Sequence, residues 1–390
     1  FNEVIVTNSY NKGEKRSKVT GSIATVAAKQ LENRSLASFD QILQGQVAGV
    51  TVQSGSGQPG SSAKVRIRGT SSIGSNNEPL YILDGVPITV GDFGSLNAND
   101  FESISALKDA AATSIYGSRG AYGVVMITNK KGKEGNAIFS YNTYTGYKYV
   151  PSLNIMSSPA KWSERVLAQN NGVLTPQMEM IKRMGTHTNW EEVMYDGGMI
   201  TDHNLSISGG SANTKFRASL GYNSDEGVQL TDDFKKYNFS VNLDTKSGKM
   251  EYGVMLNPSY TNQRLFAAGN GNINYVRQQS WLPIFLDENS IKFINPSFIT
   301  ANGIKVGDYA EEKFFTNYNL ATNTPGTGTT SINVTGDGNP YANVVERNNR
   351  VYQTKMYGST YFKYNFNEHF SFKQTIGGDY RLIKNTNFAA

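Results

Sequence analysis

The sequence predicts a membrane all-β protein, in which a small mixed α/β domain precedes a wall of transmembrane antiparallel β-strands. Three observations support this fold class. The composition changes near residues 132–136, where a mixed pattern gives way to tyrosine-rich segments of alternating polarity. These segments are roughly 8–12 residues long, near the length that a tilted strand needs to cross a bilayer. Short turns and very long loops follow one another between them, as in outer-membrane barrels.

The first 135 residues predict the mixed domain. Short β-prone runs predict strands at 50–52, 64–68, 80–83, 86–88 and 124–128. The Asp84-Gly85 pair lies between two of these runs and predicts a tight hairpin. Helical spacing at Phe39, Ile42 and Leu43 predicts one short helix. Small residues over 109–116 predict a second helix, which Gly117 should end.

Beyond residue 135, apolar and polar residues alternate with a period of two. This pattern predicts about seven strands, over 139–149, 205–208, 215–222, 237–243, 252–261, 355–366 and 370–380. The polar face consists of Asn, Ser, Lys, Asp and Gly, which suit a water-filled lumen, whereas Tyr and Phe near the strand ends suit interfacial girdles. We expect almost no helix in the segments between these strands.

The connections between the strands carry more weight than the period. Short turns at 211–214, 246–249 and 367–368 alternate with long links, of which 151–199 and 265–350 are the longest. Compact soluble domains rarely contain such long loops. We therefore favour a membrane barrel, and a soluble β-sandwich, which would show the same alternation, stays as the alternative.

The composition argues against several function classes. The formal charge of +5 is scattered and forms no basic stripe with stacking aromatics, so a nucleic-acid surface is not expected. The chain has no Cys, and its three His residues have no metal-ligand spacing. Gly55–Gly60 has dinucleotide-loop spacing, but a strand rather than a helix follows it. We expect no enzyme activity, no cofactor and no metal.

Four segments in sequence order resemble the plug domain of TonB-dependent outer-membrane transporters, and more narrowly the SusC/RagA group. They are Leu43–Val50, Val65–Gly69, Pro79–Pro87 and Leu107–Ala121. The plug-motif positions that this resemblance singles out are Arg66, Arg68, Gly69, Asp84, Gly85, Tyr116, Gly117, Arg119 and Gly120. The second half is similar to the first barrel strands of that group at Asn189–Glu192, His203–Gly210, Ala218–Tyr222 and Glu226–Gly227.

The N-terminal pentamer resembles the TonB box of this family. Its residues are Glu3, Val4, Ile5, Val6 and Thr7. An extended, β-prone segment of this kind suits β-augmentation, in which its backbone pairs with an edge strand of a partner protein. An ordinary first strand is the alternative interpretation.

The resemblance also implies a domain organisation. Residues 1–10 would carry the TonB-box segment, 11–135 the plug inside the lumen, and 136–390 the first part of the barrel. Family members close a barrel of about 22 strands, and an open edge in lipid leaves backbone groups unpaired. We therefore expect this chain to be the N-terminal part of a longer protein. The periplasmic domain that often precedes the plug in this group is not found here.

The function implied is TonB-dependent import of oligosaccharides or oligopeptides across the outer membrane of a Gram-negative cell. The expected partners are TonB, a SusD-like surface lipoprotein, the oligosaccharide or oligopeptide ligand, and membrane lipid or lipopolysaccharide. A dimer of transporter–lipoprotein pairs is one arrangement that the resemblance allows. The alternatives are siderophore or cobalamin uptake, a passive porin or adhesin, and a surface enzyme.

Two sets of plug residues have expected roles in such a transporter. Arg66 and Arg68 are expected to meet carboxylates on the barrel wall. The candidate substrate-binding residues lie in the two loops 71–78 and 89–96, where side chains could supply hydrogen bonds and a stacking face. They are Asn76, Asn77, Asp92 and Phe93.

Overall fold

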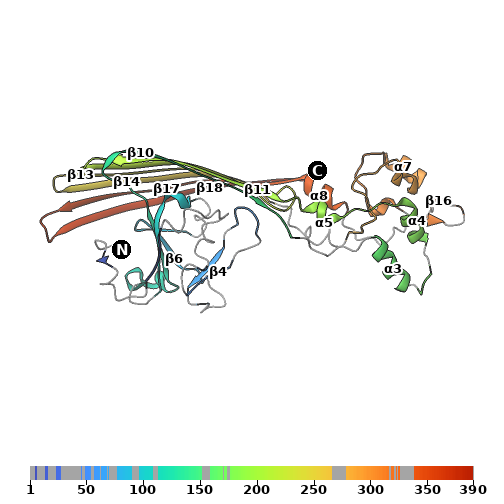
Figure 1. Cartoon of the computed structure of the whole chain (residues 1–390), viewed down its shortest axis with the longest axis horizontal. Coiled ribbons are helices and arrows are strands. Elements are labelled where there is room, and N and C mark those ends of the chain that lie inside the picture. Colours follow the sequence, from blue (N-terminus) through green and yellow to red (C-terminus); the bar gives the residue numbers. More distant parts are fainter. Residues whose placement is uncertain are drawn as a thin grey trace.

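The computed structural model describes a long strand wall, a small N-terminal domain against one face of it, and a helical region at one end (Figure 1). The described residues are 5–6, 14–15, 23–27, 45, 49–53, 57–61, 63–67, 69, 77–89, 96–108, 113–151, 159–169, 171–173, 176–265, 278–315, 318–319, 322, 324–325 and 338–389.

The wall is one seven-stranded sheet, in which each strand pairs antiparallel with the next wall strand along the chain. Its strands are β10 (Gly135–Lys148), β11 (Gly198–Gly210), β12 (Thr214–Glu226), β13 (Asp233–Ser247), β14 (Met250–Arg264), β17 (Arg347–Asn365) and β18 (Ser371–Ala389). Both the predicted strands and the predicted order of short turns and long loops are confirmed. The strands are longer than predicted, because their polar ends continue the hydrogen-bond ladder.

The N-terminal domain contains a five-stranded sheet of order β3-β8-β9-β6-β7. Its strands are β3 (Ile23–Ala27), β6 (Leu80–Leu83), β7 (Val86–Ile88), β8 (Phe101–Leu107) and β9 (Val124–Asn129). Two further pairs are β1 (Ile5–Val6) with β2 (Glu14–Lys15), and β4 (Val50–Gln53) with β5 (Lys64–Ile67). The strands β6 and β9 run parallel, so this sheet is mixed.

The turn at Asp84-Gly85 confirms the predicted hairpin. Both residues have positive φ, 46° at Asp84 and 91° at Gly85, which is the type I′ geometry that suits the twist of paired strands. Gly117 interrupts the helical segment, as predicted, although the segment is 3₁₀ rather than α-helical. The 3₁₀ segment η5 (Ser114–Gly120) consists of two helical pieces, which meet at a kink where Gly117 has φ 58° and ψ −146°. Glycine tolerates this conformation because it has no Cβ. The predicted helix at Phe39–Leu43 lies outside the described residues.

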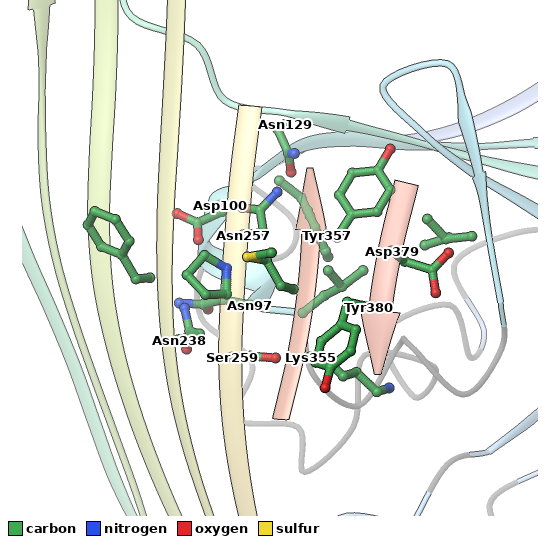
Figure 2. Close-up of a pocket in the computed structure, with 16 residues that line it drawn as sticks. Asn97, Asp100, Asn129, Asn238, Asn257, Ser259, Lys355, Tyr357, Asp379 and Tyr380 are labelled. Atoms are coloured by element: carbon green, nitrogen blue, oxygen red, sulfur yellow. The ribbon is translucent and has the colours of Figure 1, made fainter. Parts of the chain in front are cut away.

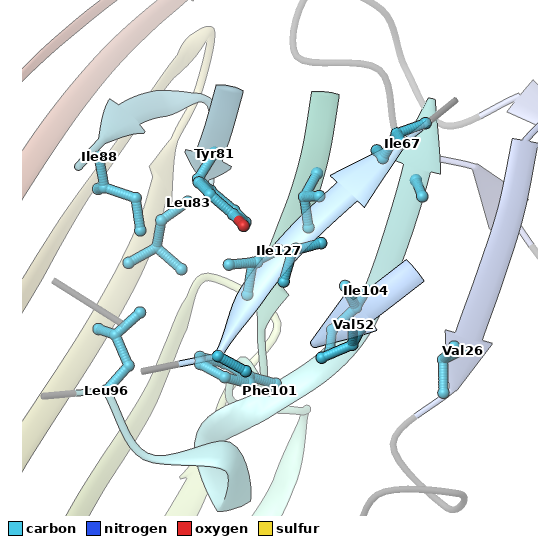
Figure 3. Packing of buried hydrophobic residues seen from close by; sticks show 14 of the residues in the cluster. Val26, Val52, Ile67, Tyr81, Leu83, Ile88, Leu96, Phe101, Ile104 and Ile127 are labelled. Atoms are coloured by element: carbon cyan, nitrogen blue, oxygen red, sulfur yellow. The ribbon is translucent and has the colours of Figure 1, made fainter. Parts of the chain in front are cut away.

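Apolar side chains from β4, β5 and the mixed sheet form the core of the N-terminal domain (Figure 3). Tyr81, Leu83, Phe101, Ile104 and Val125 are each at most 2% exposed. Two wall residues, Met255 and Tyr357, belong to the same cluster. The domain is therefore anchored on the wall by a small apolar contact, within an otherwise polar interface described below.

The two long loops fold together into a helical region that we call the outer module, comprising the described residues of 159–197 and 278–346. Its helices are α3 (Pro159–Gln169), α4 (Pro176–Met184), α5 (Trp190–Met194), α7 (Pro296–Asn302) and α8 (Pro340–Val345). It also has η6 (Ser290–Phe293), η7 (Glu312–Phe314), β15 (Tyr318–Asn319) and β16 (Thr324–Pro325). In Figure 1 the helices gather at the end of the wall away from the N-terminus.

The expectation of almost no helix in these loops is wrong. Trp190 and Met180 of the first loop and Trp281, Leu282 and Phe315 of the second are at most 1% exposed, and they share one apolar core. Each short helix is stabilised by this packing rather than by its own length. None of the helices in the described part of the chain has the length and hydropathy that a helical membrane span requires.

Candidate functional site

The N-terminal domain lies on the polar face of the wall, which we call the inner face. Buried residues on this face are mostly amides and hydroxyls, namely Asn204, Ser206, Ser219, Asn223, Ser240 and Asn242. Their sequence neighbours on the other, outer face are large and exposed, as at Leu205, Leu220 and Leu243. The predicted separation of a hydrophilic and an apolar face is therefore confirmed.

Asp100 makes the most buried ion pair of this interface. It ends the 3₁₀ turn η4 (Ala98–Asp100), which the Asn97 side chain caps by accepting a hydrogen bond from the Asn99 amide. The Asp100 carboxylate accepts a hydrogen bond from the Ser219 hydroxyl at 2.6 Å and pairs with the Arg217 guanidinium at 3.3 Å. Both charged side chains are nearly inaccessible, at 11% for Arg217 and 7% for Asp100.

Burial raises the pKa of Asp100 above its ordinary value, and the Ser219 hydrogen bond and the Arg217 charge offset only part of that effect. A carboxylate in this position therefore carries a net desolvation penalty despite two good partners. The docked domain consequently binds a proton at Asp100 more readily than an undocked, hydrated domain would.

Further polar contacts surround this ion pair. The Asn99 amide donates to the Asp202 carboxylate at 3.2 Å, and the Lys236 ammonium donates to the Leu96 carbonyl at 2.9 Å. Figure 2 shows Asn97 and Asp100 beside residues of β14 and β17 around a small cavity. This part of the interface is thus held by hydrogen bonds and charge rather than by apolar packing.

The segment that joins the domain to the wall, Lys130–Glu134, is fixed on the inner face. The Lys131 ammonium pairs with the Asp244 carboxylate at 3.1 Å, and the Asn242 amide donates to the Lys130 carbonyl at 3.4 Å. Gly132 lies so close to β12 that an added Cβ would be 2.3 Å from the Phe216 carbonyl oxygen. Only glycine fits at this crossing without displacing the backbone.

A third contact joins the hairpin side of the domain to β14 and β17. The Tyr357 hydroxyl donates to the Leu83 carbonyl at 3.2 Å, and the Asn129 amide lies 2.9 Å from the Met255 sulfur. Asp84 accepts a hydrogen bond from the Asn129 backbone amide at 3.1 Å. Burial raises the pKa of Asp84, an effect that this hydrogen bond and the charge of Lys131 partly offset.

A cavity of about 380 Å³ lies between this hairpin and the wall, near the short-turn end. Its lining includes Asp84, Lys131, Asp244, Tyr361 and Lys373. The Tyr361 hydroxyl donates to Asp244 at 2.6 Å, and the Lys373 ammonium lies 4.8 Å from the Tyr361 ring centroid. Charges of both signs line this cavity, so it suits water and polar solutes. In the described part of the chain no cluster of three or more His, Asp or Glu side chains could hold a metal.

The plug-motif residues lie in several places in the N-terminal domain. Asp84 and Gly85 form the hairpin turn against the wall, Tyr116 is half-buried, and Gly120 is buried. Gly69, Gly117 and Arg119 are exposed. Arg66 is half-buried on β5 and makes no ion pair with a wall carboxylate among the described residues, and Arg68 lies outside the described residues.

The box and loop residues are only partly described. Ile5 and Val6 pair with Lys15 and Glu14, while Glu3, Val4 and Thr7 lie outside the described residues. Asn77 is half-buried, whereas Asn76, Asp92 and Phe93 also lie outside them. The roles predicted for all these residues stay predictions.

Sequence reasoning did not identify the charged residues that dock the domain. Asp100, Arg217, Lys131 and Asp244 carry the two ion pairs across the interface. The available signal was the alternation itself, since Arg217 lies between Phe216 and Ala218, and Asp244 follows the exposed Leu243. Their partners could not be assigned, because nothing in the sequence sets the register of the domain against the wall.

Comparison with known proteins agrees with this architecture. The family model described as the TonB-dependent receptor plug domain matches residues 15–124. TonB-dependent receptor P26 of Formosa agariphila is 30% identical over 97% of this chain and 35% of its own length. TonB-dependent receptor SusC of Bacteroides thetaiotaomicron is 34% identical over 59% of this chain and 23% of its own length. The chain thus spans about a third or less of these relatives.

A solved structure has a similar fold. The RagAB peptide importer in its open-open state superposes with a TM-score of 0.77 and 26% identity, over 98% of this chain and 43% of that chain. Both the N-terminal domain and the strand wall are therefore shared with that protein.

Proposed function

Because this chain belongs to the SusC/RagA group of TonB-dependent outer-membrane transporters, we propose that it serves in the active import of oligosaccharides or oligopeptides, with its N-terminal domain as a movable plug. The observation that carries the proposal is the polar docking of this plug on the inner face of the wall. RagAB is a peptide importer, which supports oligopeptides as cargo beside oligosaccharides.

The plug contacts the wall mainly through hydrogen bonds and two ion pairs. Separating such a surface exchanges these contacts for contacts with water, at little net cost for each hydrogen bond. The apolar part of the contact is small and consists mainly of Met255 and Tyr357, with Phe234 against Gly60 and Val86 against Gly377. A plug held in this way can be moved by an external force, whereas a continuous apolar core would resist separation.

We assign energy coupling to TonB acting on the Glu3–Thr7 box. Its central residues, Ile5 and Val6, form a short strand with β2. A segment that already pairs in antiparallel fashion can also pair with an edge strand of a partner. The alternative, that this segment is an ordinary first strand, predicts that changing it leaves import unaffected.

We assign the lid to a SusD-like surface lipoprotein. The outer module stands at the end of the wall opposite the short turns and has its own apolar core. Long loops of outer-membrane barrels lie on the extracellular side. A module with its own apolar core in that position can provide a preformed binding surface for such a lipoprotein partner.

A cross-link between the plug and the wall tests the proposal directly. Val86 of β7 lies against Gly377 of β18, and a Cβ added at Gly377 would be 2.8 Å from Val86 Cγ1. This spacing suits a disulfide between Val86→Cys and Gly377→Cys. The sequence has no Cys, so the two introduced thiols are the only ones within these 390 residues. We expect oxidation to reduce uptake at least tenfold and reduction to restore it.

The matched control uses the same position on β18. Ser359 lies beside Gly377 on the wall, with its Cβ 3.3 Å from the added Cβ, so Ser359→Cys with Gly377→Cys cross-links wall to wall. This variant should import normally when oxidised. If the oxidised Val86→Cys/Gly377→Cys protein took up substrate as fast as the same protein after reduction of the disulfide, the plug would not move at this contact.

A further inference from the structure

The glycine-rich loop after β4 contains a tight turn that reaches the wall. The Ser61 amide donates to the Gln58 carbonyl at 3.0 Å, and Gly60 has a φ of 76°. Proline at the second position and a residue with positive φ at the third are typical of a type II turn, and here they are Pro59 and Gly60. We call residues 58–61 the plug turn.

Two hydrogen bonds fix the plug turn on the wall. The Gln263 side-chain amide of β14 donates to the Pro59 carbonyl at 2.6 Å. The Gln58 side-chain amide donates to the Asp232 carboxylate, which lies just before β13, at 3.2 Å. The wall thus supplies one donor for a backbone carbonyl and one acceptor for an amide, which are the two kinds of polar group that a peptide offers.

An aromatic ring of the wall covers the plug turn. A Cβ added at Gly60 would lie 2.4 Å from Phe234 Cδ2, so the ring packs on a Cα that carries no side chain. Phe234 is 5% exposed, although its strand turns polar side chains to the inner face. The next inner positions of β13 are polar or charged, namely Lys236, Asn238, Ser240, Asn242 and Asp244. Without an occupant, a phenyl ring on this face would be exposed to water, which is unfavourable.

The three residues that hold the plug turn, Asp232, Phe234 and Gln263, form what we call the wall site. Phe234 and Gln263 face each other across the ladder between β13 and β14. Asp232 lies in the turn between β12 and β13, where its carbonyl accepts from the Gly227 amide at 2.7 Å. In the same turn the Leu230 amide donates to a carbonyl of α5 at 2.9 Å. The wall site should therefore keep its shape when the plug turn leaves, which lowers the cost of binding another ligand.

A further acceptor lies in the same row of the inner face. Asp225 of β12 is opposite Phe234 in the ladder and is 1% exposed. One of its carboxylate oxygens pairs with Lys148, whereas Oδ2 has no hydrogen-bond partner in the described part of the chain. Leaving a buried acceptor unpaired is unfavourable. A peptide longer than the plug turn could donate a backbone amide or its terminal ammonium to this oxygen.

We propose that the wall site binds oligopeptide cargo and that the plug turn occupies it at rest, so that cargo and plug compete for the same three side chains. The present occupant is itself a peptide, held through a backbone carbonyl, an amide group and an unsubstituted Cα. Cargo with a similar glycine-containing segment fits the same groups. Its capture would free the outer-module end of the plug, while the contacts of Asp100 and Lys131 with the wall persist. The inference rests on the proposed import function and names oligopeptides as its substrate class.

The test measures the binding of a free peptide to the purified full-length protein in nanodiscs. The probe is the acetylated and amidated pentapeptide Gly-Gln-Pro-Gly-Ser, which repeats residues 57–61. A tethered competitor has an effective concentration on the order of millimolar, so the unaltered protein should bind the probe weakly. In Gly60→Ala the added methyl pushes the plug turn off the Phe234 ring. We expect this variant to bind the probe at least tenfold more tightly, as measured by isothermal titration calorimetry.

Matched variants separate competition from a general loosening of the plug. Gly57→Ala lies in the same loop and has a similar φ of 77°, but open space surrounds its Cβ, so its affinity for the probe should stay unchanged. Gln58→Leu removes the hydrogen bond to Asp232 and should raise the affinity about threefold. Adding Gln263→Leu to Gly60→Ala removes the donor for the probe carbonyl and should return binding to the weak level.

Unchanged probe affinity in both Gly60→Ala and Gln58→Leu would overturn the proposal, as would tighter binding that survives Gln263→Leu. Equal binding by Gly60→Ala of a second peptide, with Ala in place of the second Gly of the probe, would also overturn it, because the Phe234 ring would then not select a bare Cα. Equal binding of maltohexaose would overturn the assignment of oligopeptides. Binding in nanodiscs needs no TonB, so normal uptake by the cross-linked plug–wall protein would refute plug movement and leave the peptide site intact.

Discussion

At the scale of single residues, Asp100 determines how charge is held between the plug and the wall. Its carboxylate is almost fully buried and is shared by Arg217 and Ser219. Removing one partner of a buried ion pair is more harmful than removing both charges, because the remaining charge keeps its desolvation penalty without compensation. Either single substitution therefore leaves the other charge buried without a partner, but only Asp100 can lose its charge by binding a proton.

We expect Arg217→Met to weaken plug docking by about 3 kcal/mol at pH 7.5, and Asp100→Asn, which leaves Arg217 buried without a counter-charge, to weaken it by a similar amount. The raised pKa of Asp100 sets the pH dependence. Protonation of Asp100 stabilises the docked plug. This contribution to the free energy of docking is complete below the pKa of a hydrated Asp, about 3.9, and is lost as the pH rises through the raised pKa of the docked state. The deficit of Arg217→Met should therefore shrink on acidification.

Hydrogen exchange of the β8 amides at pH 4.5 and 7.5, corrected for intrinsic rates, measures this effect. Asp100→Asn is the control, because it keeps the shape but cannot titrate. A deficit of Arg217→Met that stays constant with pH would show that Asp100 does not exchange its proton in the docked plug.

At the scale of elements, the linker Lys130–Glu134 connects the plug sheet, which we propose to be movable, to the strand wall. It is held by Lys131 on Asp244 and by the close approach of Gly132 to Phe216. This element should therefore stay on the wall when the N-terminal side of the plug is displaced.

Gly132→Ala should release this linker. The added methyl would overlap the β12 backbone, and overpacking of this kind destabilises by on the order of 1–3 kcal/mol. The linker contains three trypsin sites, at Lys130, Lys131 and Lys133. Trypsin cleaves the linker only when it is detached from the wall, so a larger detached population should accelerate cleavage about tenfold. Gly378→Ala has open space around it and is the matched control. Unchanged cleavage in Gly132→Ala would mean that the linker already stands clear of the wall.

The elements also show what the sequence could and could not predict. The wall strands were predictable because a sheet with one wet and one lipid face alternates at every residue, as in 237–243. The hairpin was predictable because Asp84-Gly85 has its own turn geometry. The outer module was not, since its helices are short and their apolar residues, such as Trp190 and Trp281, find partners about 90 residues away. The Asp100–Arg217 pair could not be predicted for the same reason, because the local sequence does not determine how the plug lies against distant wall strands.

At the scale of the whole molecule, the proposed TonB box precedes strand β3, so a pull on it would reach the plug from the side of β3. Strand β3 is the edge of the plug sheet and pairs only with β8 among the described strands. Force applied before β3 therefore reaches the least supported strand first, while β8 and β9 stay tied to the wall through Asp100 and Lys131.

Ile5→Pro should abolish uptake without changing the amount of protein in the outer membrane. Proline removes an amide that a partner strand needs and restricts the backbone. Ile5→Ala keeps the amide and should retain most of the activity. Uptake in energised cells, normalised to surface protein, measures both variants. Full uptake by Ile5→Pro would favour the interpretation of this segment as an ordinary strand.

The outer module has a consequence for biogenesis. Its first loop leaves the wall between β10 and β11 and its second between β14 and β17, so four strands separate them. Trp190 of the first loop donates to the Gln279 carbonyl of the second at 3.0 Å. Both loops contribute to one apolar core, so the core of the outer module is complete only when the chain up to Val344 is present. Burial of both indole rings should therefore report that the two loops, with strands β11–β14 between them, have folded together.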